Sequence, residues 1–335
     1  MTRLISFVTA ALLVAIYSMA VSAQNWDDIV ATAKKERELT VYNGFGGGDE
    51  FKEINALFQK RYGITVKMLE GRGSEIAERV RTEVATGHAI GDVTVNGATA
   101  NTGLSQANAF QVPGTLPNMS KVILEKTFVE EVPLFVNAYG ITVNSKLVPP
   151  GQEPKTWADI LDPKWKGKII SDEMSSSGTG HTWFSVTLEK FGEDFHRKLA
   201  TQNLQFSRTV RENPRRVAMG EFAMYIQTAM SDVGRLEGLP IRGVVPKEGL
   251  PYTSFSGAMI KNAPRPNAAR VYINFVLEPE AQLVLAKAGF PVSTGDLGDK
   301  VPANLRHLVN APLLGRQNLE GQAERLKLAK EIYGR

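Results

Sequence analysis

The chain has 335 residues, 39 of them basic and 35 acidic, with a formal net charge of +4 and no cysteine. The lack of cysteine excludes disulfides, thiolate metal sites and cysteine nucleophiles. The small positive excess is spread along the chain rather than gathered in a basic run, so the sequence carries no nucleic-acid-binding signature. The length suits two lobes or domains of about 150 residues each.

The first 23 residues have the pattern of a secretory signal peptide. Arg3 supplies a positive charge, an apolar run extends from Leu4 to Val21, and small residues up to Ala23 form a cleavage site. A run of about 18 apolar residues could also span a membrane. Its Ser and Thr interruptions and its small-residue end favour a cleaved signal, so we expect a free protein in the periplasm.

The remainder alternates short strands with amphipathic helices, which predicts an α/β fold. In the first part of the chain a βαβαβ unit is expected, with a helix over 26–37, a strand over 39–42, a helix from about 49, a strand over 64–68, a helix from 73 and a strand over 92–95. A second lobe is expected from about 120 to 255, with strands over 139–143, 168–170 and 222–226. The segment 256–260 resembles a strand that returns to the first lobe, and residues near 305–332 are expected to form packing helices.

Ligands of such sheets bind beyond the carboxyl ends of the strands. Asn43 and Gly44 open a glycine-rich loop there, and glycine allows a ligand to approach the backbone closely. The loop has neither the Gly-Lys-Ser/Thr of a P-loop nor the dinucleotide fingerprint G-x-G-x-x-G. An ordinary strand–helix turn explains it equally well.

Two further loops could hold an anion. In Arg72-Gly73-Ser74, Ser74 is a suitable helix N-cap and the Arg72 guanidinium is suited to grip a carboxylate or phosphate. A second, hydroxyl-rich loop precedes an apolar helix, and a flexible surface loop is its alternative interpretation. Its candidate ligand-binding residues are Ser175, Ser176, Ser177, Gly178 and Thr179.

Catalytic and metal-binding patterns are weak. The histidines show no metal-ligand spacing, and no G-x-S-x-G nucleophile elbow is present. A Ser-His-Asp site assembled from separated residues stays open. We expect no catalytic residue, no metal site, no cofactor and no enzyme activity. The four histidines are His88, His181, His196 and His307.

Segments along most of the chain carry a similarity to a known family. They are Leu39–Gly44, Gly73–Ile76, Gly91–Val93, Thr142–Leu147, Asp162–Ile169, Val217–Glu221 and Tyr252–Ala258. They resemble family 1 extracellular solute-binding proteins, in the branch of the periplasmic ferric-iron-binding proteins; the segment D-P-K-W-K-G-K-I is the most specific.

The resemblance implies a hinged, two-lobed periplasmic-binding-protein fold of type II, with the ligand cleft between the lobes. From the order of the predicted elements we expect residues 24–120 and about 257–300 in the N-terminal lobe, and 121–256 with about 301–335 in the C-terminal lobe. The resemblance also implies delivery to an inner-membrane ABC permease by a protein that is not an enzyme. We expect a monomer that does not bind nucleic acid.

The family's iron site does not carry over. Its adjacent tyrosines would fall in the stretch Gln227–Asp232, and no two tyrosines are adjacent in the chain. Its histidine falls at Phe45 or Gly46 and its acidic position at Asn96. With Ser256 and the loops above, the remaining candidates suit a small organic anion such as a carboxylate, phosphonate or phosphate ester.

Three alternatives stay open from the sequence. Iron could bind through an exogenous anion held by the two loops. The protein could be an exported enzyme on the same fold, or the binding subunit of a membrane receptor.

Overall fold

The computed structural model describes residues 25–45, 49–236, 238–295 and 297–334. The expected signal peptide lies outside these residues, as do all three glycines that follow Phe45. Within the described part of the chain, no helix is long and apolar enough to cross a membrane.

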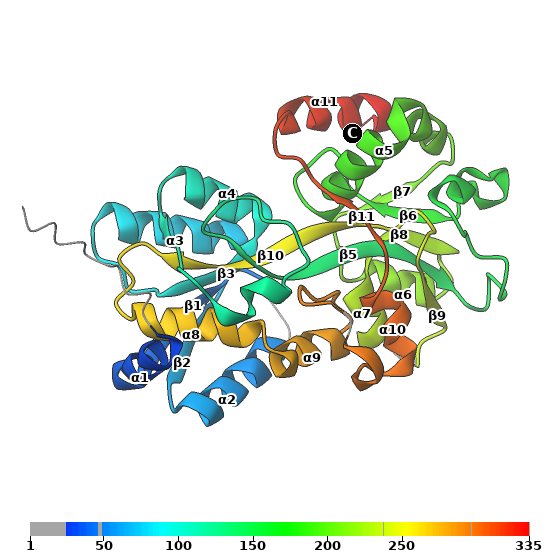
Figure 1. Ribbon diagram of the computed structural model, residues 1–335. Helices are drawn as coiled ribbons and strands as arrows, with labels where there is room; N and C mark the ends of the chain where they lie inside the picture. The colour runs from blue at the N-terminus through cyan, green and yellow to red at the C-terminus, as the bar shows by residue number, and fades with distance from the viewer. Residues whose placement is uncertain (1–24, 46–48, 237, 296, 335) are drawn as a thin grey trace, which may run out of the picture.

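Two lobes lie side by side, joined at the centre by two long strands (Figure 1). The first lobe contains α1 (Trp26–Glu36), β1 (Glu38–Asn43), α2 (Glu50–Tyr62), β2 (Thr65–Glu70), α3 (Gly73–Ala85), β3 (Val93–Gly97), α4 (Ala98–Gln106), β4 (Phe110–Gln111), α8 (Pro266–Val276) and α9 (Pro279–Lys287). The second contains β6 (Ile169–Asp172), α5 (Thr179–Ala200), β7 (Gln205–Ser207), α6 (Asn213–Ala218), β8 (Met224–Ala229), α7 (Met230–Arg235), β9 (Ile241–Val244) and α11 (Gln322–Tyr333). Outside these sets lie the joining strands β5 (Val132–Asn144) and β10 (Leu250–Ile260), together with α10 (Ala303–Val309) and β11 (Leu313–Arg316).

The expected βαβαβ unit forms the first lobe. β1 pairs in parallel with β2 on one side and with β3 on the other. α2 follows β1 and buries Phe51, Ile54 and Phe58 against the sheet, which is the apolar stripe expected from helical periodicity. The helix ends at Gly63, a left-handed residue whose N–H bonds to the Gln59 carbonyl oxygen. Because the three strands are parallel, their carboxyl ends lie at one edge of the sheet, where Gly97 of β3 pairs with Phe255 of β10.

The crossover strands, β5 and β10, run through both lobes. β10 pairs antiparallel with β3 and with the first half of β5, and the second half of β5 pairs with β8 and β9. The strands expected at 139–143 and 256–260 are thus parts of longer strands. The pattern of side chains does not show that a single strand passes from one lobe into the other. The sequence therefore predicted only the most apolar part of each strand.

The apolar core is divided between the lobes. One cluster lies in the first lobe, includes residues of α9 and also contains Leu305 and Leu308 of α10. A second cluster surrounds Trp157 and Trp183, and α11 adds Ala329 to it. The last part of the chain therefore packs on both clusters, with α10 beside α9 and α11 on α5.

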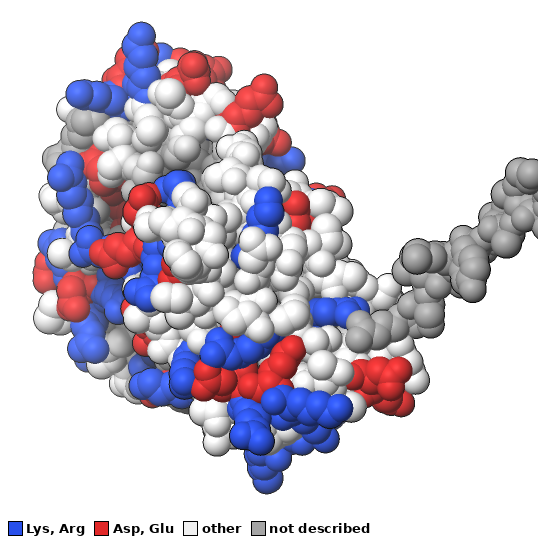
Figure 2. All heavy atoms as spheres, turned by 90° about the vertical axis from the view of Figure 1, so that its left-hand side faces the viewer, with Lys and Arg blue, Asp and Glu red and all other residues white. Residues whose placement is uncertain are grey.

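Charged side chains of both signs are interspersed on the face formed by the first lobe (Figure 2). An ion pair joins the lobes: Arg235 Nη2 of α7 lies 2.7 Å from Glu50 Oε1 of α2. The Arg235 guanidinium also lies over the Phe290 ring, 5.8 Å from its centre. Because Glu50 is largely buried, this pair is a contact that lobe movement would have to break.

We expect Arg235→Ala to separate the lobes. The free energy of unfolding should fall by about 1 kcal/mol, as for a partly exposed ion pair. The radius of gyration from small-angle X-ray scattering should rise. Arg61→Ala is the matched control, because its side chain is equally exposed, at 41%, but its partners Glu278 and Glu280 lie in the same lobe. An unchanged radius for Arg235→Ala would contradict the prediction.

Candidate ligand-binding site

Asn96, the penultimate residue of β3, organises the edge of the first lobe. Its Nδ2 donates to the Gly73 carbonyl oxygen at 3.0 Å, and its Oδ1 accepts from Gly97 N–H at 2.9 Å. A β-carbon at Gly44 would overlap the Asn96 side chain, and one at Gly73 would lie 2.7 Å from Asn96 Oδ1. Close approach to Asn96 is therefore the physical reason for glycine at both positions.

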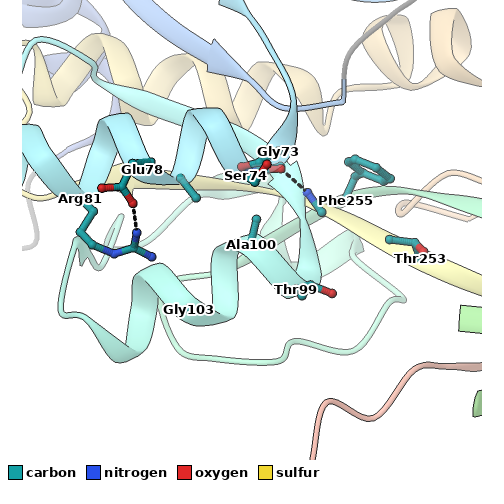
Figure 3. A pocket seen from close by; sticks show the side chains of 12 residues that line it. Gly73, Ser74, Glu78, Arg81, Thr99, Ala100, Gly103, Thr253 and Phe255 are labelled. Atoms are coloured by element: carbon teal, nitrogen blue, oxygen red, sulfur yellow. Dashed lines mark hydrogen bonds and ion pairs between the residues drawn. The ribbon is translucent and has the colours of Figure 1, made fainter. Parts of the chain in front are cut away.

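Beside Asn96 a cavity of about 530 Å³ opens between α3, α4 and β10 (Figure 3). Small residues of the two helices, such as Ala77 and Gly103, leave this space free. At its outer end Arg81 is ion-paired with Glu78. The lining residues are Gly73, Ser74, Ala77, Glu78, Arg81, Asn96, Gly97, Thr99, Ala100, Gly103, Thr253 and Phe255.

Thr253 and Phe255 are contributed by a crossover strand, and the sequence analysis missed both. The quoted similarity segment Tyr252–Ala258 contains them, but only alternation along β10 separates cavity-facing residues from the others. Thr253 Oγ1 lies 3.0 Å from the hydroxyl of Tyr139 on β5. Phe255 packs against Phe45, with ring centres 4.9 Å apart.

Three predicted site residues make internal hydrogen bonds instead of lining the cavity. Asn43 Oδ1 accepts from Phe45 N–H at 3.0 Å. Gln227 Oε1 accepts from Asp172 N–H at 3.0 Å, and Ser256 Oγ accepts from Asn101 Nδ2 at 3.0 Å. All three side chains are buried.

The loop before α3 differs in part from expectation. The N-cap is Arg72, not Ser74, and the Glu75 carboxylate accepts its backbone N–H at 3.1 Å. A glutamate three residues into the helix satisfies this donor, so a serine cap is not needed. Ser74 lines the cavity, whereas the Arg72 side chain is 86% exposed and lies 3.9 Å from Glu75 Oε1.

The 175–179 loop belongs to the second lobe. Ser175 Oγ donates to Glu173 Oε1 at 2.9 Å, and Gln322 Nε2 lies 3.5 Å from Ser177 Oγ. Ser176 and Gly178 are exposed. Thr179 begins α5, and its side chain interacts with the Tyr139 hydroxyl. Thr179 is thus the loop residue that reaches the crossover strands.

Residues 88–312 match the family of bacterial extracellular solute-binding proteins, which is more than half of the chain. The chain belongs to this family. A Salmonella typhimurium protein named for 2-aminoethylphosphonate binding in the periplasm is 25% identical over 307 residues, 84% of this solute-binding protein and 83% of its relative. A Haemophilus influenzae protein is 27% identical over 141 residues, so the match spans 41% of each chain.

Solved structures confirm the two-lobed fold of type II for this solute-binding protein. The Trichodesmium protein IdiA (FutA), in complex with iron and citrate, aligns with a TM-score of 0.72 at 19% identity, over 88% of this chain and 99% of that one. The Actinobacillus pleuropneumoniae protein AfuA with fructose-6-phosphate aligns with a TM-score of 0.59 at 18% identity, over 89% and 96%. At these identities the likeness concerns the fold.

The stretch where the resemblance predicts the iron-binding tyrosines is the end of β8 and the start of α7. Here Ala229 and Met230 are apolar and Ser231 is buried. Asp232 pairs with Arg235 at 3.4 Å. Among the described residues, no three His, Cys, Asp or Glu side chains form a group that could hold a metal ion.

Asp172 ends β6 directly before the loop that leads to Thr179. Its Oδ2 accepts from the Tyr225 hydroxyl at 2.7 Å and its Oδ1 accepts from Asn213 Nδ2 at 2.9 Å. Burial raises the pKa of Asp172 to about 7, against the two hydrogen bonds, which lower it. The folded protein therefore retains a proton at a pH where the unfolded chain has released it.

Because this carboxyl has a raised pKa, its stabilising contribution is present at pH 4 and is lost as pH rises toward 7. Asp172→Asn has no such carboxyl, so its free energy of unfolding should not show this loss. The difference in free energy of unfolding, variant minus wild type, should be larger at pH 8 than at pH 4 by on the order of 2–4 kcal/mol. Denaturant unfolding at both pH values measures this, with Asp194→Asn on the exposed side of α5 as control. A wild-type-like pH dependence in Asp172→Asn would refute the expectation.

Proposed function

We propose that this solute-binding protein is the periplasmic subunit of an ABC importer and captures a small organic anion. The observation that carries the proposal is the cavity of about 530 Å³ beside the crossover strands. Its volume suits a small ligand. Its inner end meets Thr253 of the strand that joins the lobes, so a ligand there would adjoin the second lobe.

The chemistry of the cavity mouth favours an anion. The amino end of α3 opens on it through Gly73 and Ser74, and helix amino ends carry unpaired N–H groups and a partial positive charge. Arg72 stands exposed at the same helix end with only a distant carboxylate partner. Phosphonate, phosphate-ester and carboxylate groups all match this arrangement. The name of the Salmonella typhimurium relative, which refers to 2-aminoethylphosphonate, and the fructose-6-phosphate bound by the structural neighbour AfuA agree with this class.

Closure of the lobes would couple ligand capture to transport. A ligand that contacts both lobes stabilises the closed state in proportion to its extra affinity for that state. The permease would then receive the closed, loaded protein. The proposal includes export through the signal peptide expected over residues 1–23, and it gives the protein no catalytic step.

We expect Arg72→Ala to weaken binding of an anionic ligand about tenfold, because an exposed charged hydrogen-bond donor is lost. Isothermal titration should use 2-aminoethylphosphonate, ethylphosphonate, propionate and fructose-6-phosphate. Arg197→Ala is the control. This exposed arginine lies in the second lobe, near the carboxyl end of α5, and it pairs with Glu193 and Glu331. Full affinity of Arg72→Ala would contradict the role given to the guanidinium.

Native mass spectrometry of protein purified from the periplasm without refolding tests the proposal as a whole. An organic anion that dissociates from the protein supports it. Stoichiometric iron with a visible charge-transfer band would replace it with the iron alternative, in which the anion only bridges metal and protein. Turnover of the bound compound would favour an exported enzyme.

A further inference from the structure

One face of α3 lines the cavity from the amino end of the helix outward. Four of its residues lie at positions i, i+3, i+4 and i+7, which is the spacing of a single helix face. They are Ser74, Ala77, Glu78 and Arg81, and all four line the cavity. From Ser74 to Glu78 the helix rises about 6 Å. A charged group therefore stands at a fixed distance from the amino end of α3, where the proposed function puts the anionic group of the ligand.

Small residues line the space between these two points. Ala77 belongs to α3, whereas Ala100 and Gly103 belong to α4. A β-carbon added at Gly103 would meet no atom of another part of the chain within 4 Å, so the cavity is open beside α4. These three residues offer no polar side-chain atom. A short chain of carbon atoms can therefore pass from the amino end of α3 to Glu78.

The outer end of the cavity carries an accessible carboxylate. Arg81 Nη1 is ion-paired with Glu78 Oε2 (Figure 3). The Glu78 side chain is 68% exposed and that of Arg81 48%, so a ligand can reach both. No described residue donates a hydrogen bond to the second oxygen, Glu78 Oε1. A carboxylate has about four acceptor sites, so Glu78 can accept further donors while Arg81 stays in place.

Glu78 lies nearer than Arg81 to the amino end of α3. Side chains on a helix lean toward its amino end, which displaces the carboxylate toward Ser74. Arg81 is three residues further out, and its guanidinium is already ion-paired. A ligand that extends outward from Ser74 therefore meets the carboxylate first. A carboxylate only accepts hydrogen bonds, and a positively charged donor complements it best.

From this geometry we infer that Glu78 is a specificity-determining residue whose carboxylate binds an amino group of the ligand. The ligand class is a short ω-amino organic anion. Its anionic group lies at the amino end of α3, its carbon chain passes the small residues, and its ammonium group pairs with Glu78. This inference rests on the proposed function and narrows its ligand class.

Matched ligands test the inference by isothermal titration of the full protein. The pairs are ethylphosphonate with 2-aminoethylphosphonate, and propionate with 3-aminopropionate. Wild type should bind the amino member about fivefold more tightly, the upper range for an ion pair with an exposed carboxylate. Glu78→Gln keeps the shape of the side chain and removes its charge, so the ratio of the two affinities should fall below about twofold. Added salt should lower the wild-type ratio, because the charges are exposed.

Two variants of the same helix serve as controls. Glu75 lies one turn before Glu78, is 63% exposed and does not line the cavity. In Glu75→Gln the new amide oxygen can still accept the Arg72 N–H, so the helix keeps its cap and the amino preference should stay. Arg81→Ala should act in the opposite direction to Glu78→Gln: it removes the cation that neutralises Glu78, so the amino preference should rise. Thermal melting establishes that each variant is folded.

Two further compounds examine the charge that the outer end selects. 2-Hydroxyethylphosphonate should bind more weakly than 2-aminoethylphosphonate, because a hydroxyl donates a hydrogen bond but carries no charge. 2-Carboxyethylphosphonate should bind no more tightly than ethylphosphonate. Tighter binding of this dianion, lost in Arg81→Ala, would overturn the inference, because the outer end would then hold a second anionic group through Arg81.

The outcomes separate this inference from the proposed function. If wild type binds both members of each pair equally, or Glu78→Gln keeps the preference, the inference is overturned while anion capture stands. Loss of the preference in Glu75→Gln as well would also overturn it, since the effect would not be specific to Glu78. If wild type binds no member of either pair, the proposed function fails and the inference with it. Loss of the preference in Glu78→Gln, with Glu75→Gln unaffected, supports the assignment.

Discussion

The antiparallel hydrogen bonds between β5 and β10 hold the two lobes in one continuous sheet, and the groups at the inner end of the cavity are positioned by this ladder. Its register pairs Thr253 with Asn137 and Phe255 with Phe135. Because side chains alternate between faces, the same register turns Ser256 toward α4. A shift by one residue would exchange the two sets. The register therefore decides which side chains of β10 face the cavity.

A second constraint is the crowding around Asn96. The side chain is held between Gly44 and Gly73 and bonds to the backbone at the start of α3. It thereby fixes the distance from the end of β3 to the amino end of α3, where the cavity opens. In the iron-binding branch an acidic group is expected at this position. Here a neutral amide stands at this position, bonds to backbone on both sides and also lines the cavity.

The same fold serves different cargoes, since solved relatives hold iron with citrate or fructose-6-phosphate. The fold by itself therefore does not identify the cargo, which depends on the side chains that the fold presents. Here the cavity lining is mostly small, neutral or hydroxyl-bearing, with the Glu78–Arg81 ion pair at its outer end and the amino end of α3 beside it. The buried carboxyl of Asp172 accepts hydrogen bonds from Asn213 and Tyr225 and so joins three segments of the second lobe.

The sequence by itself determined the α/β alternation, the βαβαβ unit, the family and the loops at the strand ends, because these depend on local periodicity and on residue order. It could not show that the side chains of Asn43, Gln227 and Ser256 bond to other groups of the protein. In a sequence, a polar residue at a strand end looks the same whether its partner is protein or ligand. The sequence also could not pair Asn137 with Thr253, which are far apart in the chain. Only the tertiary structure decided these points, because strand register and close packing between distant segments determine where each polar group finds its partner.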